Sequence, residues 1–377
     1  MRRPLSAFLA ALLLTAFALT AQAGVTAPAL TAKDRGEPRE AALFAPTGTV
    51  SHPPQLMSVA GPIPAATAGL ALTHEHVLVD FIGAAEAGPH RYDAEAVFTA
   101  VLPHLIRAHE LGARLFVECT PAHLGRDPRL LQRLSAASGL HILTNTGLYG
   151  ARHGKFLPAY VATESAEQLA ARWIAEARDG IDGTGIRPGF IKCGINPEPE
   201  LSATDRKLVE AAALAHLATG LPIAVHTSQG PGLAQLEILK AHGVAPSAWI
   251  WVHAQQARDA DILAAAAQGA WVSFDGLSPE TAQRHLELCL LLRDQGRLDR
   301  VLLSHDAGWY RPGQPDGGKF RGFEFLFTDF VPSLEAAGFT TAQLDQVLRE
   351  NPARAYAFGP LALASPKAPS PPPKVAH

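Results

Sequence analysis

Short β-rich apolar runs alternate with helix-period stretches through most of the 377-residue chain, and this alternation constrains the fold more than any other feature. The eight apolar runs occupy residues 70–76, 113–120, 141–147, 189–194, 222–227, 249–253, 270–275 and 301–306. The stretches between them place apolar residues three and four positions apart, as amphipathic helices do. Strands that alternate with helices predict βαβ units and a parallel sheet.

The predicted helices follow the strands one by one, and several of them close on glycine, a common helix C-terminus. They occupy residues 94–112, 128–139, 165–180, 204–220, 233–243, 259–269 and 280–296, with two more at 323–338 and 341–358. Eight strand–helix units fit a closed barrel better than an open doubly wound sheet. No GxGxxG follows the first run, so the motif of a dinucleotide-binding fold is missing. We therefore predict an α/β fold, a single (β/α)8 TIM barrel over residues 56–360.

The two ends of the chain differ from this pattern. Residues 1–23 carry Arg2 and Arg3, a Leu/Ala-rich stretch and then Ala21-Gln22-Ala23, the pattern of a cleavable signal peptide. Its apolar stretch is shorter than the ~20 residues that span a bilayer. We therefore expect a periplasmic or secreted protein that is cleaved after Ala23 and keeps no stable membrane anchor; an uncleaved anchor is the alternative. Residues 24–55 predict a short extension or linker, and residues 361–377 a disordered Pro-rich tail.

Charge and cysteine content exclude some functions and leave one alternative open. The formal net charge is −3 and no basic cluster occurs, which argues against nucleic-acid binding. Cys119 and Cys193 lie in apolar runs, and Cys289 lies in a helical pattern. Three cysteines in a large chain indicate buried free thiols. A Cys119–Cys193 disulfide is the alternative, because an oxidising compartment favours disulfides.

Polar side chains recur where the predicted strands end. They are His74 and His76 in the first strand, Lys192 in the fourth, His226 in the fifth, His253 in the sixth, and His305 and Asp306 in the eighth. The C-terminal strand ends of a (β/α)8 barrel form its functional face. Because residues two apart in a strand share a face, His74 and His76 can converge on one metal ion, while Glu75 must point toward the helices.

Each of these residues also has a purely structural interpretation. A single histidine at a strand end is more often a hydrogen-bonded core residue than a ligand. Lys192 is different, because burying an unpaired ammonium is costly, so this lysine should face outward, be neutral or be chemically altered. Asp306 alone could be a capping residue. Four histidines, a lysine and an aspartate at one end of one barrel together predict a metal site.

The chain resembles the phosphotriesterase family of the amidohydrolase superfamily from about Val59 to Phe358. The motifs that carry the resemblance are GPI at 61–63, LTHEH at 72–76, GRDP at 125–128, NTGLY at 145–149, FIKCG at 190–194, VHTSQG at 225–230, SFDG at 273–276, LLSHD at 302–306 and NPARAY at 351–356. Their order and spacing are specific. The resemblance implies a hydrolase with two divalent metal ions, usually Zn²⁺, that cleaves an ester-type bond of a small molecule, phosphoester, lactone or carboxylic ester, by a metal-bridged hydroxide.

The resemblance also implies a role for each candidate residue. His74, His76 and Asp306 would hold the more buried ion, His226 and His253 the more exposed ion, and Lys192 would bridge the two as a carbamate (N6-carboxylysine). A carbamate resolves the buried-lysine problem, because it turns an ammonium into an anionic oxygen ligand. Asp306 would also be catalytic, taking the proton of the hydroxide during attack. A homodimer is implied by the family and not by the residues themselves.

The match has two informative departures. The chain has Gln255 and Gln256 where organophosphate-hydrolysing members carry an acidic pair. Gly276 follows Asp275 where those members carry a histidine and lactonase-like members an arginine. Both departures remove a proton-relay partner of the metal-bound aspartate, which argues against efficient phosphotriester hydrolysis. A metal-binding protein with little turnover is therefore an alternative function. A cyclic amidase is another, because cyclic amidases of the superfamily share the lysine.

Four residues are candidates for the substrate pocket. Tyr149 matches a family position that holds an aromatic residue near the metals, and a plain packing role is its alternative. Trp309, Tyr310 and Arg311 lie in a long Gly/Pro-rich segment after the eighth strand. Loops at this end of a barrel commonly select the substrate. For each of the three, simple coverage of the barrel edge is the alternative.

Overall fold

The structure is a computed structural model that describes residues 53–227 and 230–358. The predicted signal peptide, almost all of the predicted extension and the predicted tail lie outside these residues. Among the helices in the described ranges, none has both the length and the apolar character needed to cross a membrane.

All eight apolar runs form strands of a parallel barrel. In chain order the strands are β3 (Leu70–Leu78), β4 (Ala113–Glu118), β5 (His141–Leu143) with β6 (Asn145–Thr146), β7 (Phe190–Gly194), β8 (Ile223–His226), β9 (Trp249–Val252), β10 (Trp271–Phe274) and β11 (Val301–Leu303). Parallel pairing runs from β3 through β4 to β5, and from β6 through β7, β8, β9 and β10 to β11. β5 and β6 are separated by Thr144 alone, so they form the interrupted third strand.

The barrel closes where the first strand meets the segment that follows the eighth. Thr73 Oγ1 donates a hydrogen bond to the Leu303 carbonyl at 3.0 Å, across 230 residues of sequence. The Asp306 amide donates to the His74 carbonyl at 3.0 Å, and the His76 amide donates to the Ala307 carbonyl at 2.9 Å. The next strand, β12 (Gly308–Tyr310), pairs in parallel with β3. These bonds complete the predicted (β/α)8 barrel.

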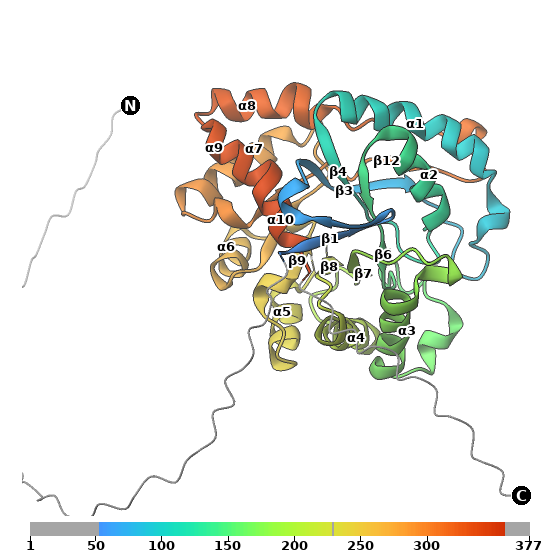
Figure 1. The fold of residues 1–377 in the computed structure, drawn as a ribbon. Coiled ribbons are helices and arrows are strands. Elements are labelled where there is room, and N and C mark those ends of the chain that lie inside the picture. Colours follow the sequence, from blue (N-terminus) through green and yellow to red (C-terminus); the bar gives the residue numbers. More distant parts are fainter. Residues whose placement is uncertain (1–52, 228–229, 359–377) are drawn as a thin grey trace, which may run out of the picture. The chain divides into compact units, whose positions relative to one another are not determined.

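Helices lie outside the strands, as Figure 1 shows. They are α1 (Ala94–Glu110), α2 (Pro128–Ser138), α3 (Ala166–Asp179), α4 (Ala203–Thr219), α5 (Gly232–Ala241), α6 (Asp259–Gln268), α7 (Ala282–Asp294), α8 (Val331–Ala336), α9 (Thr341–Asp345) and α10 (Asn351–Ala355). Ser165 and Gln168 form a capping box at the start of α3, and Gly139 ends α2 at a φ of 78°. The two late predicted helices each contain a π-helical turn, η9 (Leu326–Phe330) and η10 (Gln346–Glu350).

Two apolar clusters form most of the core. The larger one fills the space between the strands and the helices. The other takes alternate residues of the strands, such as Leu115 and Val117 of β4, and fills the barrel interior together with Leu56 and Tyr356. Leu56 belongs to a hairpin that the sequence did not predict, β1 (Gln55–Ser58) with antiparallel β2 (Gly61–Pro64). The side chains of this second cluster fill the barrel interior, which leaves the carboxyl ends of the strands free to form a cavity.

All three cysteines are buried and free, as predicted. Cys119 and Cys193 are each 0% exposed and belong to different apolar clusters. The alternative prediction, a Cys119–Cys193 disulfide, is wrong.

Candidate metal centre

A cavity of about 390 Å³ lies at the carboxyl ends of the strands and is lined by all six residues that the sequence assigned to metal binding. They are His74 and His76 of β3, Lys192 of β7, His226 of β8, His253 directly after β9, and Asp306 three residues after β11. The barrel topology thus collects side chains that are up to 232 residues apart in sequence onto one concave surface. Its size suits a small-molecule ligand.

The imidazoles of β3 are held so that their Nε2 atoms face Asp306. His76 Nδ1 lies 2.7 Å from Thr120 Oγ1, and its Nε2 lies 3.0 Å from Asp306 Oδ1. His74 Nδ1 lies 3.2 Å from Asp275 Oδ2, and its Nε2 lies 3.9 Å from Asp306 Oδ1. A partner on Nδ1 fixes the ring orientation and leaves Nε2 free to bind a metal.

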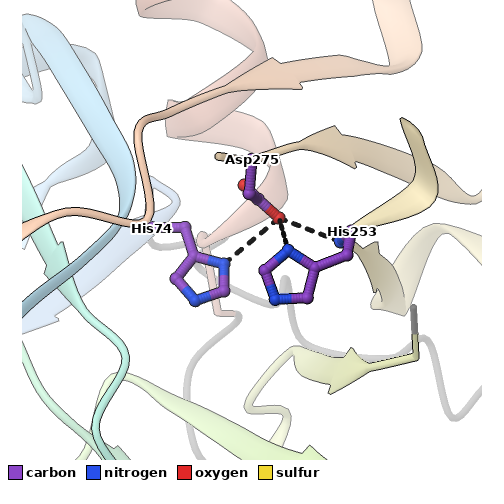
Figure 2. Close-up of side chains that lie close together, drawn as sticks. All are labelled: His74, His253 and Asp275. Atoms are coloured by element: carbon purple, nitrogen blue, oxygen red, sulfur yellow. Dashed lines mark hydrogen bonds and ion pairs between the residues drawn. The ribbon is translucent and has the colours of Figure 1, made fainter. Parts of the chain in front are cut away.

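Asp275 also belongs to the centre, although the sequence did not predict this role. Figure 2 shows its carboxylate contacting the rings of both His74 and His253 from one side. It also accepts hydrogen bonds from the His253 amide at 3.0 Å and from Ser273 Oγ at 2.7 Å, and it is 0% exposed. Because Asp275 contacts the Nδ1 side of the rings and does not line the cavity, we assign it the orienting role of a carboxylate behind a histidine ligand.

Two residue triplets bring possible ligand atoms within 4.8 Å of one another, His74–His253–Asp275 and His74–His76–Asp306. The second triplet faces the cavity, so it is the better metal site. Both ring nitrogens of His74 are buried without a hydrogen-bond partner; Nδ1 has only the ion-pair contact with Asp275, and Nε2 would gain a partner from an ion. Imidazole nitrogens with a carboxylate form a ligand set suited to zinc and related divalent ions.

The local electrostatics favour the neutral form of three of the histidines. Burial lowers the pKa of His74 well below its usual value, and the nearby charge of Lys192 lowers it further. Burial also lowers the pKa of His226, again strongly. His253 follows the same direction because burial outweighs the two aspartates that raise its pKa. Neutral imidazole is the metal-binding state.

Lys192, His226 and Tyr149 form the second half of the cavity. The rings of His226 and His253 are 4.5 Å apart between centroids, and the Tyr149 hydroxyl lies 3.0 Å from His226 Nε2. Lys192 is only 2% exposed and lines the cavity, so the buried lysine expected from the sequence is present. Within the described residues, no carboxylate forms an ion pair with its Nζ. The residues present therefore fit a site that needs two ions and an anionic bridge.

Several residues that line the cavity have a strained backbone, as do turns elsewhere in the chain. His253, Asp306 and Trp309 have φ values of 63°, 51° and 77°, a region that residues other than glycine rarely adopt, and all three line the cavity. Such strain is typical of functional sites, where surrounding packing holds it in place. Burial raises the pKa of the Asp306 carboxyl, but the hydrogen bond from His76 and the electrostatic interaction with the neighbouring imidazoles outweigh this and bring it below its usual range.

Glu75 points away from the cavity, as the strand alternation predicted, but it contacts the chain after β11. Its carboxylate accepts hydrogen bonds from Ser304 Oγ (2.7 Å), the His305 amide (3.0 Å), His305 Nδ1 (2.7 Å) and the Ala307 amide (2.8 Å). His305 Nε2 in turn accepts from the Leu326 amide at 2.9 Å. His305 is therefore a structural residue, and its neighbour Asp306 is held in place by this network.

Three of the four pocket candidates line the cavity, and Tyr310 does not. Trp309 and Arg311 line it together with Tyr149, whereas Tyr310 packs against the main apolar core. The physical reason is that this segment begins as the strand β12, in which successive side chains point to opposite sides. Sequence analysis missed the remaining lining residues, Val79, Phe81, Cys119, Pro121, Leu124, Arg152, Lys155 and Phe156, most of which lie in loops without a regular period.

The two positions where the chain departs from the family motif have a structural explanation. Gln255 Oε1 accepts a hydrogen bond from the Asp275 amide at 3.1 Å, and its Nε2 donates to the Asp275 carbonyl. Gly276 has a φ of 77°, which a side-chain-bearing residue would adopt only with strain. Gln256 is exposed. The uncharged side-chain amide of Gln255 therefore fixes the Asp275 backbone at the position where an acidic residue would stand.

Comparison with known proteins finds one family along almost the whole described chain. The model of the phosphotriesterase family matches residues 54–356. A phosphotriesterase homology protein of Escherichia coli is 33% identical over 293 residues, covering 76% of this chain and 98% of that protein. An aryldialkylphosphatase of Saccharolobus solfataricus is 27% identical (76% and 95% covered), and an N-acetyltaurine hydrolase of Rattus norvegicus is 26% identical (81% and 98%). The solved organophosphorus hydrolase of Deinococcus radiodurans superimposes with a TM-score of 0.73 at 28% identity, covering 82% and 99%.

Proposed function

Because the chain belongs to the phosphotriesterase family, we propose that it is an exported hydrolase that holds two divalent metal ions, Zn²⁺ by preference, and cleaves an ester-type bond of a small molecule. One observation carries this proposal: the six side chains that suit a two-ion site line a single cavity. The neutral state of the buried histidines supports it, because neutral imidazole is the form that binds metal.

The residues divide into two groups around the bridging position. His74, His76 and Asp306 would hold one ion, and His226 and His253 the other. Lys192, carboxylated on Nζ, would lie between the two groups. When bound, two ions would polarise the substrate oxygen and lower the pKa of the attacking water from 15.7 toward 7. Asp306, with its carboxylate ionised, accepts the proton that the water releases.

Metal content and the state of Lys192 test the site. Purified protein should contain about two equivalents of transition metal per chain, and Lys192→Ala should lower that content. Protein prepared in carbon-13 bicarbonate should show a carbamate resonance that Lys192→Met abolishes. Less than about one equivalent of metal, together with no effect of Lys192→Ala, would contradict the proposal.

A substrate panel tests the chemistry. Zinc, manganese and cobalt forms of the full chain are assayed with aryl esters, lactones and phosphotriesters. We expect turnover of at least one ester class, and weak turnover of phosphotriesters because Gln255 and Gly276 stand where relay residues would be. Full metal occupancy with no turnover in any class would instead favour a metal-binding protein.

An amide bond is the second candidate, because one similar protein, 26% identical, is named as an N-acetyltaurine hydrolase. Lys192 is compatible with this candidate, because cyclic amidases of the superfamily share the bridging lysine. N-acyl amino acids, N-acyl aminosulfonates and cyclic amides therefore belong in the same panel. A higher kcat/KM for an amide than for the matched ester would show that the protein is an amidase.

Export is proposed from the first 23 residues alone. Expression of the full chain in a bacterium with an outer membrane should place the protein in the periplasmic fraction or the medium. Mass spectrometry should find a mature chain that begins at Gly24. Intact protein beginning at Met1 in the cytoplasmic fraction would contradict this part of the proposal.

A further inference from the structure

Three basic side chains line the cavity beside the proposed metal ligands. Arg152 and Lys155 lie in the turns between β6 and α3, and Arg311 directly follows β12. Asp306 is the one carboxylate among the lining residues, and it belongs to the proposed ligand set. The part of the cavity that would contact the rest of the substrate is therefore basic.

These three cations lack the carboxylate partners that other arginines of the chain have. Arg91 pairs with Asp80 at 2.9 Å, and Arg172 pairs with Glu164. In the described ranges no carboxylate lies within ion-pair distance of Arg152, Lys155 or Arg311. Arg152 and Lys155 are exposed, and Lys155 Nζ donates to a neutral acceptor, the Phe81 carbonyl, at 2.7 Å. Arg311 Nε is buried without any hydrogen-bond acceptor. A buried donor of this kind is suited to an acceptor supplied by a ligand.

An aromatic wall lies beside the cations. The Phe81 ring is 5.6 Å from Trp309 and 6.1 Å from Phe156, and Phe156 is 5.9 Å from Tyr149, measured between centroids. Arg311 stacks over Trp309 at 5.4 Å, so the basic and apolar parts of the cavity are continuous. Phe81 is 40% exposed and lines the cavity, so its ring offers apolar surface to a ligand.

We propose that the substrate carries an anionic group, a carboxylate, sulfonate or phosphate oxyanion, that binds to Arg152, Lys155 and Arg311, next to an apolar part that packs on Phe81 and Trp309. This inference rests on the proposed hydrolytic function and narrows its substrate class. Neutral phosphotriesters and simple lactones would leave these three charges without a partner.

Matched substrate pairs test the proposal in the metal-loaded full chain. One pair is methyl para-nitrophenyl phosphate, an anion, and dimethyl para-nitrophenyl phosphate, its neutral ester. The other pair is para-carboxyphenyl acetate and the corresponding methyl ester. The measured quantity is the ratio of kcat/KM for the anion to that for the neutral partner, because comparing this ratio between variants cancels intrinsic reactivity. Arg152→Gln, Lys155→Met and Arg311→Gln should each lower the ratio, roughly 5- to 30-fold for Arg311, in at least one pair.

The pair that responds identifies the oxyanion, phosphate or carboxylate. Arg129→Gln is the matched control, because Arg129 is exposed on α2 and does not line the cavity. Its ratio should stay at the wild-type value. A ratio that is unchanged in both pairs for all three cavity variants would overturn the proposal. An equal loss in Arg129→Gln would overturn it too, since the effect would then follow net charge and not position.

A binding measurement separates failure of this inference from failure of the proposed function. Phenylphosphonate and its neutral dimethyl ester are titrated calorimetrically into metal-free full chain whose fold is checked by circular dichroism. The anion should bind more tightly, and Arg311→Gln should remove most of that preference. If no substrate is turned over but this preference is present, the hydrolytic function fails and the anion site stands. If the preference is absent, the anion site is wrong whatever the protein hydrolyses.

Discussion

Asp275 makes a direct prediction at the scale of single residues. Its carboxylate lies 3.2 Å from His74 Nδ1 and accepts the His253 amide, so it orients two proposed ligands without lining the cavity. Asp275→Asn should lower zinc affinity roughly 10- to 100-fold while the fold is kept, because the rings lose the charge that fixes their orientation. Competition with a chromophoric chelator measures the affinity. Asp294→Asn, at an exposed position on α7, should change nothing, and an unaltered affinity in Asp275→Asn would contradict the assigned role.

The cysteines predict a chemical reactivity that burial controls. Burial raises the pKa of Cys193 and of Cys289 to about 12, and Cys119 is also fully buried. Because the thiolate is the reactive form, native protein should react with a disulfide reagent at pH 8 far more slowly than a free thiol does. Addition of guanidinium chloride should then release all three thiols. Fast labelling of native protein, or fewer than three thiols after unfolding, would contradict the buried free state.

Single residues also show where the sequence was sufficient. His74, His76, Lys192, His226 and Asp306 could be predicted as neighbours because each lies near the carboxyl end of a predicted strand, and these ends meet on one face of a barrel. The partners behind them could not, since contacts such as the one between Thr120 and His76 depend on turns without a period. The same limit applies to Tyr310, which does not line the cavity because it lies on the far side of a strand that resembled a loop.

At the scale of elements, Glu75 joins the first strand to the chain after the eighth. Its fully buried carboxylate accepts four hydrogen bonds from residues 304–307. Glu75→Ala leaves these donors without an acceptor, so the free energy of unfolding should fall by about 3–5 kcal/mol. Metal content should fall with it, because Asp306 lies within the same turn.

Urea unfolding of the metal-free chain measures this loss apart from any effect of metal binding. Glu110→Ala is the control, because Glu110 ends α1 with an exposed carboxylate and should change stability by less than about 0.5 kcal/mol. A loss of similar size in both variants would show that the Glu75 network does not stabilise the closure.

The elements themselves were predictable because period two and period 3.6 are visible in a sequence. Glycines at helix ends added accurate boundaries, as at Gly139. The π-helical turns η9 and η10 were not predictable, since an inserted backbone residue leaves an apolar pattern that still reads as one helix. The N-terminal hairpin was not predicted, because its second strand, GPIP at residues 61–64, resembles a linker in sequence.

For the whole molecule, the barrel is fixed at one end by packing and at the other by the proposed metal site. At the first end, Asn351 Nδ2 donates to the Leu298 and Val301 carbonyls, both at 2.8 Å, and the Tyr356 hydroxyl donates to the Thr73 carbonyl at 2.9 Å. These contacts give the NPARAY motif a structural role in the barrel, separate from metal binding. At the other end, four imidazoles from three strand ends line the same cavity as Asp306, and both ring nitrogens of His74 are buried without a hydrogen-bond partner.

Metal binding should therefore stabilise the whole barrel. An ion that binds the folded chain alone, present at 100 times its dissociation constant, adds about 2.7 kcal/mol to the free energy of unfolding. For a domain of this size that corresponds to a rise in Tm of roughly 4 °C. Calorimetry should thus show a lower Tm after treatment with a chelator and recovery on addition of zinc. His226→Ala should reduce this shift, whereas His141→Ala, at a partly exposed position on β5 outside the cavity, should keep it. If neither chelator nor zinc changed the Tm, the convergent histidines would stabilise the barrel without a metal.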